Sequence, residues 1–289
     1  MTFLPTPRRA LVFLVALTLV LPCFAQDYKT NPRALVQRAI VNENRQETSK
    51  QYFMYRDVKR TKTGSVETRE MVQTPEAMLA RLVLIDGKPL NADQRTREDA
   101  RLNRLIAQPS EMAKKKKEQK EDDERVRKMV AAIPDAFNFE YVATEKGPTG
   151  DVVVLKFSPN PKWEPPNREL QVFTGMSGTA KIAVPQDRLA LMQARLFKGV
   201  DFGWGILGHL DPGGEFSIEQ SQVYGEHWDL THMKLHFMGK ILLFKSLNIQ
   251  EEETTSDYRP VPGMTVAQAL DRLKQADSEY SKTANGGGE

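Results

Sequence analysis

The stretch GEHWDLTHMKLHFMGKILLFKSLNI, residues 225–249, alternates apolar and polar side chains in the way that a half-buried strand does. Met233, Leu235 and Phe237 are two residues apart and would share one face, because successive side chains of a strand point to opposite sides. Residues 238–240 contain a glycine that is typical of a turn. The stretch therefore predicts two neighbouring strands of an antiparallel sheet, joined at residues 238–240.

The same stretch holds three of the four histidines of the chain, and His232 and His236 are four residues apart. On a helix this spacing would place both imidazoles on one side. On a strand the two residues are about 13 Å apart, which is too far for one zinc ion with Zn–N distances of about 2.0 Å. Lys234 lies between them on the same face. We therefore predict a solvent-facing strand without a metal; a site completed by ligands from elsewhere is the open alternative.

Strand-like segments continue on both sides of this stretch, separated by turn residues at regular spacing. They are a hairpin in residues 51–74, and residues 78–90, 136–146, 151–161, 178–184, 188–197 and 214–223. With the opening stretch they amount to about ten antiparallel strands. Residues 158–167 hold four prolines in ten positions and predict an irregular connection.

Three other segments have the helical period of 3.6 residues. They are residues 32–45, the strongly charged residues 92–133, and residues 266–280. Asn91 and Thr265 each precede a glutamine by three positions, which is a variant of the capping box. Pro109 divides the charged segment into two helices. The predicted fold class is α+β: a curved antiparallel sheet, or half-barrel, around a helix, with a charged two-helix insert.

Residues 1–25 have the pattern of a secretory signal peptide, with Arg8 and Arg9 before an apolar run. The run of about 13 residues is shorter than the roughly 20 that a spanning helix needs. A retained anchor is the alternative. Cys23 invites lipidation, but Pro22 stands where a lipobox has a small residue. After cleavage the mature chain has no cysteine, and we expect it in the periplasm or secreted, with outer-membrane association as an alternative.

We expect one half-barrel domain in residues 26–262, with the helical insert at residues 92–133, and a C-terminal helix and flexible tail in residues 263–289. The chain has 41 Lys and Arg against 38 Asp and Glu. Removal of two arginines with the signal peptide leaves 39 minus 38, a net charge of +1. This balance gives no reason to expect a nucleic acid as partner.

Two glycine-rich segments are reminiscent of catalytic or nucleotide-binding motifs. Residues 175–179, GMSGT, lack the last glycine and the following helix of a nucleophile elbow. Residues 201–209, DFGWGILGH, contain a G-x-G-x-x-G string without the βαβ context of a dinucleotide site. We expect a turn and a flexible loop, respectively. Trp204, Ile206 and Leu207 make that loop a candidate flap over a cavity.

The blocks SPNPKWEPP (residues 158–166) and DGKPLNADQ (residues 86–94) carry a resemblance. With the strand segments of residues 51–259, they resemble uncharacterised bacterial exported proteins that are grouped with the outer-membrane lipoprotein-sorting, LolA/LolB-like superfamily. The resemblance implies a half-barrel whose apolar concave cavity holds acyl chains. It implies that the following residues line the cavity: Phe216, Ile218, Met233, Leu235 and Phe237. The pattern alone equally allows simple burial against helices.

The first functional hypothesis is a non-enzymatic periplasmic carrier of lipid or lipoprotein acyl chains, without a cofactor. The second is an envelope module that binds a protein partner through the charged helices and has no ligand. Membrane contact would be at most peripheral, through the lysines of residues 114–117. A hydrolase is the third alternative, although no nucleophile and base occur in a supporting context.

Overall fold

In the computed structural model the described residues are 27–47, 51–202, 207–241 and 245–286. The expected signal peptide and Cys23 lie outside these ranges, as do the flap candidates Trp204 and Ile206.

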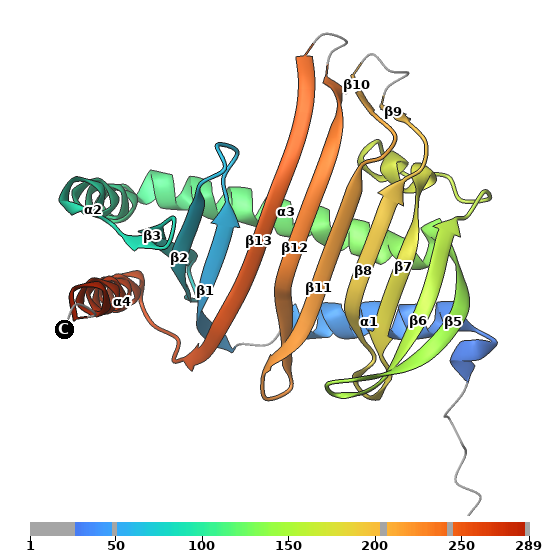
Figure 1. Ribbon diagram of the computed structural model, residues 1–289, viewed down its shortest axis with the longest axis horizontal. Coiled ribbons are helices and arrows are strands. Elements are labelled where there is room, and N and C mark those ends of the chain that lie inside the picture. Colours follow the sequence, from blue (N-terminus) through green and yellow to red (C-terminus); the bar gives the residue numbers. More distant parts are fainter. Residues whose placement is uncertain (1–26, 48–50, 203–206, 242–244, 287–289) are drawn as a thin grey trace, which may run out of the picture.

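A single antiparallel sheet organises the described chain (Figure 1). Its main path runs in the order β4-β3-β2-β1-β13-β12-β11-β8-β7-β6-β5, and the short β9 and β10 are attached beside β12. The strands are β1 (Tyr52–Arg60), β2 (Val66–Gln73), β3 (Met78–Ile85), β4 (Lys88–Pro89), β5 (Phe137–Gly147), β6 (Gly150–Pro159), β7 (Met176–Ala183), β8 (Arg188–Leu196), β9 (Val200–Phe202), β10 (Gly208–Leu210), β11 (Glu215–Tyr224), β12 (His227–Ile241) and β13 (Lys245–Val261). No described pairing joins β5 to β3 or β4, so the sheet stays open, as a half-barrel requires.

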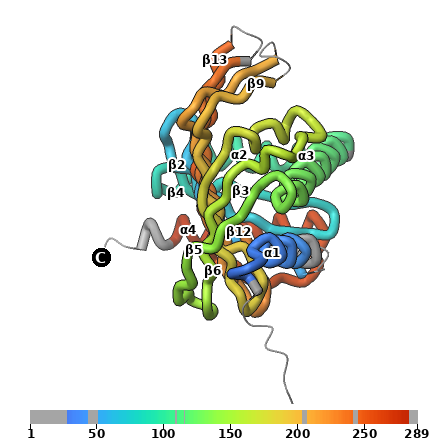
Figure 2. The backbone as a smooth tube through the Cα atoms, turned by 90° about the vertical axis from the view of Figure 1, so that its right-hand side faces the viewer, coloured from blue at the N-terminus to red at the C-terminus, as the bar shows by residue number. Residues whose placement is uncertain are grey.

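Helices cover the two faces of this sheet unequally. They are α1 (Pro32–Glu47), α2 (Ala92–Ala107), α3 (Pro109–Ala136) and α4 (Val266–Gly286), with 3-10 turns η1 (Asp27–Lys29), η2 (Glu169–Gly175) and η3 (Val184–Gln186). Both α1 and α3 lie across one face, and Figure 2 shows them on the same side of the sheet. We call it the helix-covered face and the opposite side the outer face. The expected class, α+β with a curved antiparallel sheet around a helix, is confirmed.

The larger hydrophobic core lies between α1 and the β5–β8 half of the sheet. Leu35 and Ala39 of α1 belong to one buried cluster with Val153 and Leu155 of β6, and all four are almost fully buried. The C-terminal turns of α3 close this core through Ile133. In β6 four consecutive residues, Val152 to Leu155, are buried, so both faces of this strand are covered there.

A smaller core holds α4 against the outer face of β1–β3. Met54 pairs with Val72, which pairs with Leu79, and this row packs against Leu273 of α4 and Leu102 of α2. Side chains of α2 also form hydrogen bonds with backbone groups at the free edge of β3. The N–H of Leu82 donates to Glu98 at 2.9 Å, and Arg101 donates to the carbonyl of Ala80 at 2.6 Å. This edge is therefore closed to pairing with another strand.

The expected turn at residues 238–240 is wrong, because β12 continues to Ile241 and β13 begins only at Lys245. Gly239 instead allows a close approach between strands. It pairs with Leu247 on one side and with Leu210 on the other, and a Cβ at Gly239 would lie 2.0 Å from the carbonyl oxygen of His209. The glycine is required by the attachment of β10, not by a reversal of the chain.

Candidate functional site

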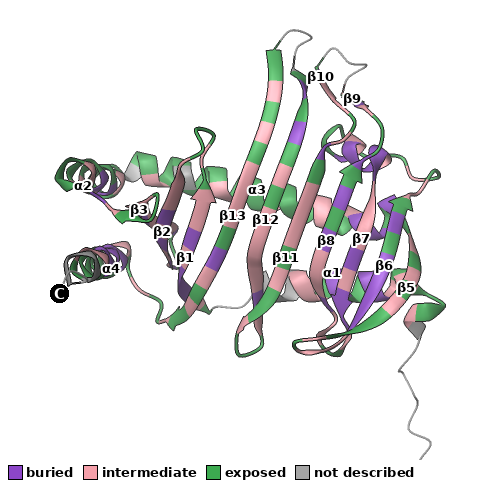
Figure 3. Cartoon of the chain, in the orientation of Figure 1, coloured by how far each residue is buried: buried purple, intermediate pink, exposed green. Residues whose placement is uncertain are grey.

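The helix α3 is fixed at its two ends and stands clear of the sheet between them. Met112 near its start packs against the smaller core, while Met129 and Val130 near its end pack against the larger one. The intervening residues are charged and mostly exposed (Figure 3). A helix that is polar all round gains no stability from burial in its middle. The middle of α3 instead lines a cavity on this side of the sheet.

The apolar residues expected to line a cavity gather on adjacent strands of the helix-covered face. Phe216 lies directly opposite Leu235, and Ile218 lies directly opposite Met233, across β11 and β12. Phe216, Leu235 and Phe237 contact the larger core. Phe237 is buried, whereas the other four are only half-buried. The pairing thus brings all five together in one apolar patch, part of which stays accessible.

A cavity of about 680 Å³ lies between α3 and the helix-covered face. It is found at the other end of β12 from the apolar patch, beside Trp228 and Leu230. Its lining is half polar. The lining residues are Glu43, Gln51, Tyr52, Tyr55, Gln73, Thr74, Pro75, Glu76, Ala77, Met78, Lys116, Gln119, Lys120, Asp123, Gln220, His227, Trp228, Asp229 and Leu230.

An ion pair between α1 and β8 stands at one side of this cavity. Arg188 lies 3.4 Å from Glu43 and donates to the carbonyl of Asn42 at 2.7 Å. Burial raises the pKa of Glu43, and the guanidinium of Arg188 opposes this rise only in part. Burial also lowers the pKa of Arg188. Burial thus disfavours the charged form of both side chains, and their mutual attraction offsets this cost only in part.

Aromatic side chains form another part of the wall. Tyr55 stacks on Tyr258 with ring centroids 4.8 Å apart, and its hydroxyl donates to the sulfur of Met78 at 3.0 Å. Burial raises the pKa of both tyrosines, so both hydroxyls stay protonated hydrogen-bond donors. His227 stacks on Phe53, and its Nε2 lies 3.5 Å from the carboxylate of Asp229. Aromatic rings thus support one part of a wall whose other side chains are mostly polar or charged.

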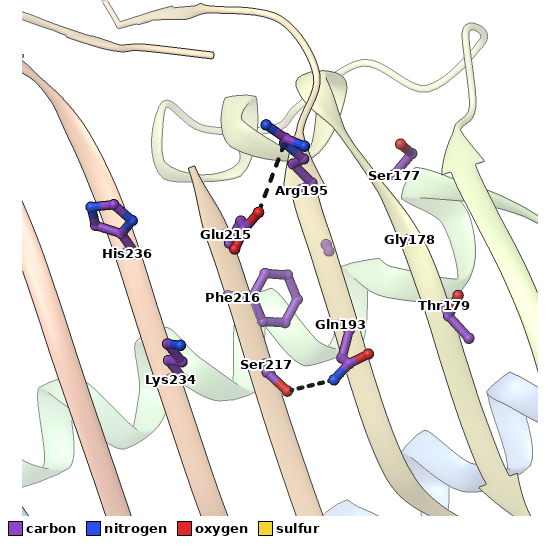
Figure 4. Close-up of a pocket in the computed structure, with 11 residues that line it drawn as sticks. Ser177, Gly178, Thr179, Gln193, Arg195, Glu215, Phe216, Ser217, Lys234 and His236 are labelled. Atoms are coloured by element: carbon purple, nitrogen blue, oxygen red, sulfur yellow. Dashed lines mark hydrogen bonds and ion pairs between the residues drawn. The ribbon is translucent and has the colours of Figure 1, made fainter. Parts of the chain in front are cut away.

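The outer face carries two of the three histidines of the opening stretch, His232 and His236. His232 lies 3.7 Å from Glu219 and 3.8 Å from Glu252, while His236 lines a shallow groove of about 430 Å³ with Lys234 (Figure 4). Most other side chains of the groove are polar, although Phe216 and Ala194 also line it, and Arg195 lies 3.8 Å from Glu215 across it. Within the described part of the chain no group of three or more His, Cys, Asp or Glu side chains could hold a metal ion.

The two glycine-rich segments have structural roles in the described chain. A Cβ at Gly178 would lie 1.9 Å from the carbonyl oxygen of Gln193, so residues 175–179 allow β7 and β8 to approach. Of the flap candidates only Leu207 is described; it is 39% exposed, and its N–H donates to Phe202 at 3.2 Å. Nearby, Nδ1 of His209 lies 2.7 Å from the carboxylate of Asp201.

The sequence prediction missed the residues of the cavity. Tyr55, Lys116 and Trp228 come from β1, α3 and β12, which are far apart in the chain. The sequence around each of them also has the pattern of an ordinary strand or of a solvated helix. The one signal was the cluster of aromatic residues at positions 52, 53 and 55, which the strand pattern explained equally well.

Neither a family model nor a curated protein matches the chain. Two solved structures are similar to it. One is a domain from Vibrio parahaemolyticus described as an outer membrane lipoprotein-sorting protein domain, with 11% identity and a TM-score of 0.29; the match covers 83% of this chain and 99% of that one. The other is a DUF1329 family protein from Desulfovibrio piger, with 10% identity and a TM-score of 0.29, over 81% of this chain and 95% of that one.

Similarity at this level transfers neither a ligand nor a role to this chain. Among the helices of the described residues, none has the length and apolar character to cross a membrane.

Proposed function

We propose that the protein is an exported, non-enzymatic carrier that binds a lipid, or the acyl chain of a lipoprotein, on the helix-covered face of its sheet. The observation that carries this proposal is the apolar patch of β11 and β12. Four of its five side chains are only half-buried, on the face of the sheet that α1 and α3 cross. Apolar area that stays accessible in a partly covered position is typical of a ligand-binding surface.

The geometry of α3 supports the same proposal. Because only its ends are packed, an elongated apolar molecule would fit between its middle and the sheet without displacing core residues. Each buried CH₂ group contributes about 0.8 kcal/mol, so ten of them would give roughly 8 kcal/mol before ordering costs. This corresponds to micromolar affinity at best, which suits reversible capture and release.

Substitution on the two faces of one strand tests the proposal. We expect Leu235→Glu to weaken binding of a fluorescent fatty acid more than tenfold, since a carboxylate would stand in the apolar patch. Lys234→Glu, on the outer face of the same strand, is the matched control and should leave binding unchanged. Circular dichroism verifies folding, and Met233→Gln is the milder second variant. Equal binding by all variants would place the ligand elsewhere and refute the proposed site.

A second candidate function is favoured by the charge of α3. Its outward lysines and carboxylates form a long exposed surface, with Lys114 near Glu118 and Lys117 near Glu121. Such a surface would suit an envelope protein with complementary charges. A chain that takes up no lipid but binds an envelope protein, and loses that partner on charge reversal at Lys114 and Lys117, would establish this function instead.

A further inference from the structure

The charges around the cavity beneath α3 are separated by side. Lys116 and Lys120 line it from α3, one helical turn apart. Across from them, Asp229 of β12 and Glu43 of α1 line it together with the aromatic side chains. Positive charge thus predominates on the α3 side of the cavity, where Asp123 also reaches the lining, and negative charge on the side of β12 and α1.

The lysines of α3 differ in their partners. On the outward side Lys114 and Lys117 each have a glutamate four residues on, at 4.0 and 3.8 Å. In the described part of the chain, neither Lys116 nor Lys120 has an ion pair within 4.0 Å. The α3 sequence therefore neutralises its outward cations and leaves those at the cavity available to an anionic group.

The sheet side fits a cation instead. Glu43 is already paired with Arg188. Asp229 has no lysine or arginine within 4.0 Å among the described residues; it lies 3.5 Å from His227 and is hydrogen-bonded to the N–H of Leu230 and the hydroxyl of Tyr258. Trp228 and Tyr55 lie in the same wall. An ammonium or quaternary ammonium group is attracted both by a carboxylate and by the faces of aromatic rings.

We propose that this cavity binds the head group of a zwitterionic, amine-bearing phospholipid. Its phosphate would lie against Lys116 and Lys120, and its ammonium would lie against Asp229 beside Trp228 and Tyr55. The inference rests on the proposed lipid-binding function and adds the class of lipid. The volume of about 680 Å³ is in the range of sites that enclose small molecules. The apolar patch farther along β12 then leaves the acyl chains a surface to follow.

Short-chain lipids test the head group without membranes. Isothermal titration of the full chain with dihexanoyl phosphatidylethanolamine and dihexanoyl phosphatidylglycerol compares a zwitterion with an anion on the same tails. We expect the ethanolamine lipid to bind about tenfold more tightly, the equivalent of one additional ion pair or about 1.4 kcal/mol. Equal affinity for the two lipids would overturn the head-group inference and leave the carrier function standing. Binding of neither lipid would overturn both.

Substitutions test where the phosphate and the ammonium of the head group bind. Asp229→Asn keeps the acceptor that binds the N–H of Leu230 at 2.7 Å, and it should weaken only the ethanolamine lipid, by about tenfold. The double variant Lys116→Gln/Lys120→Gln should weaken both lipids, while Lys114→Gln/Lys117→Gln is the matched control and should weaken neither. Equal losses for both lipids in Asp229→Asn would contradict the assignment of the ammonium. Free phosphoethanolamine that bound as tightly as the lipid would contradict the lipid as source.

Discussion

Arg81 of β3 and Asp277 of α4 form an ion pair of 2.8 Å that is almost completely removed from solvent. Asp277 also accepts a hydrogen bond from Arg95 at 3.1 Å, and Arg81 reaches Asp99 of α2 at 2.7 Å. The pair therefore connects the C-terminal helix, the edge of the sheet and the charged insert. Removal of one partner of a buried pair leaves an uncompensated charge, which costs more than the pair itself contributes.

We predict that Asp277→Ala lowers the free energy of unfolding by about 3 kcal/mol, since two guanidinium groups lose their shared acceptor. Urea unfolding followed by circular dichroism measures the change. Glu121→Gln, which removes the carboxylate of an exposed pair with Lys117, is the control and should change the value by less than about 0.5 kcal/mol. Similar effects of the two substitutions would mean that α4 is held by its apolar contacts alone.

The raised pKa of the Asp57 carboxyl group makes the stability of the protein depend on pH. Burial, reinforced by the charge of Glu253, raises the pKa of Asp57 to about 6 in the folded chain. In the unfolded chain this carboxyl group ionises near pH 4. Its contribution to the free energy of unfolding therefore decreases as the pH rises from about 4 to 6 and is constant above pH 6. We predict that Asp57→Asn stabilises the protein by about 2 kcal/mol more at pH 7.5 than at pH 4.

Urea unfolding of the wild type and of Asp57→Asn at the two pH values provides the test. Because only the difference between the two proteins is compared at each pH, other titrating groups cancel. A difference that stayed the same at both pH values would show that Asp57 is ionised in the folded chain near its ordinary pKa.

Gly178 is predicted to be indispensable for the pairing of β7 with β8. An alanine Cβ would lie 1.9 Å from the backbone oxygen of Gln193, and the backbone cannot yield as a flexible side chain would. We expect Gly178→Ala to lower the free energy of unfolding by about 2 kcal/mol or more. Ser177→Ala, one residue earlier, is the control and should have a small effect on the melting temperature. A Gly178→Ala protein with unchanged melting temperature would contradict the close approach.

Local features of the fold were predictable from the sequence. The capping boxes are confirmed: Asn91 accepts from the N–H of Gln94 at 2.9 Å, and the side chain of Gln268 accepts from the N–H of Thr265 at 2.9 Å. The alternation of Met233, Leu235 and Phe237 likewise matches their pairing on one face of the sheet. Caps and strand faces depend on residues a few positions apart, so a local pattern is enough to indicate them.

Features that depend on distant segments were not predictable. Gly239 suggested a turn because its sequence context does not reveal that β10 will pack against it. No local signal indicates the pairing of Met54 with Arg259 either. This pairing joins β1, the first strand, to β13, the last strand, in the middle of the sheet. The cavity was missed for the same reason, because its lysines read as a solvated helix face until α3 is placed across the sheet.

The central claim, that the helix-covered face binds lipid, is tested most directly by native mass spectrometry with lipid extraction on the protein purified from the envelope of bacteria that export it. The account predicts a mass increase of a single phospholipid or acyl species, lost in Leu235→Glu and retained in Lys234→Glu. A bare protein mass in all three, with no uptake after incubation with phospholipid, would contradict it.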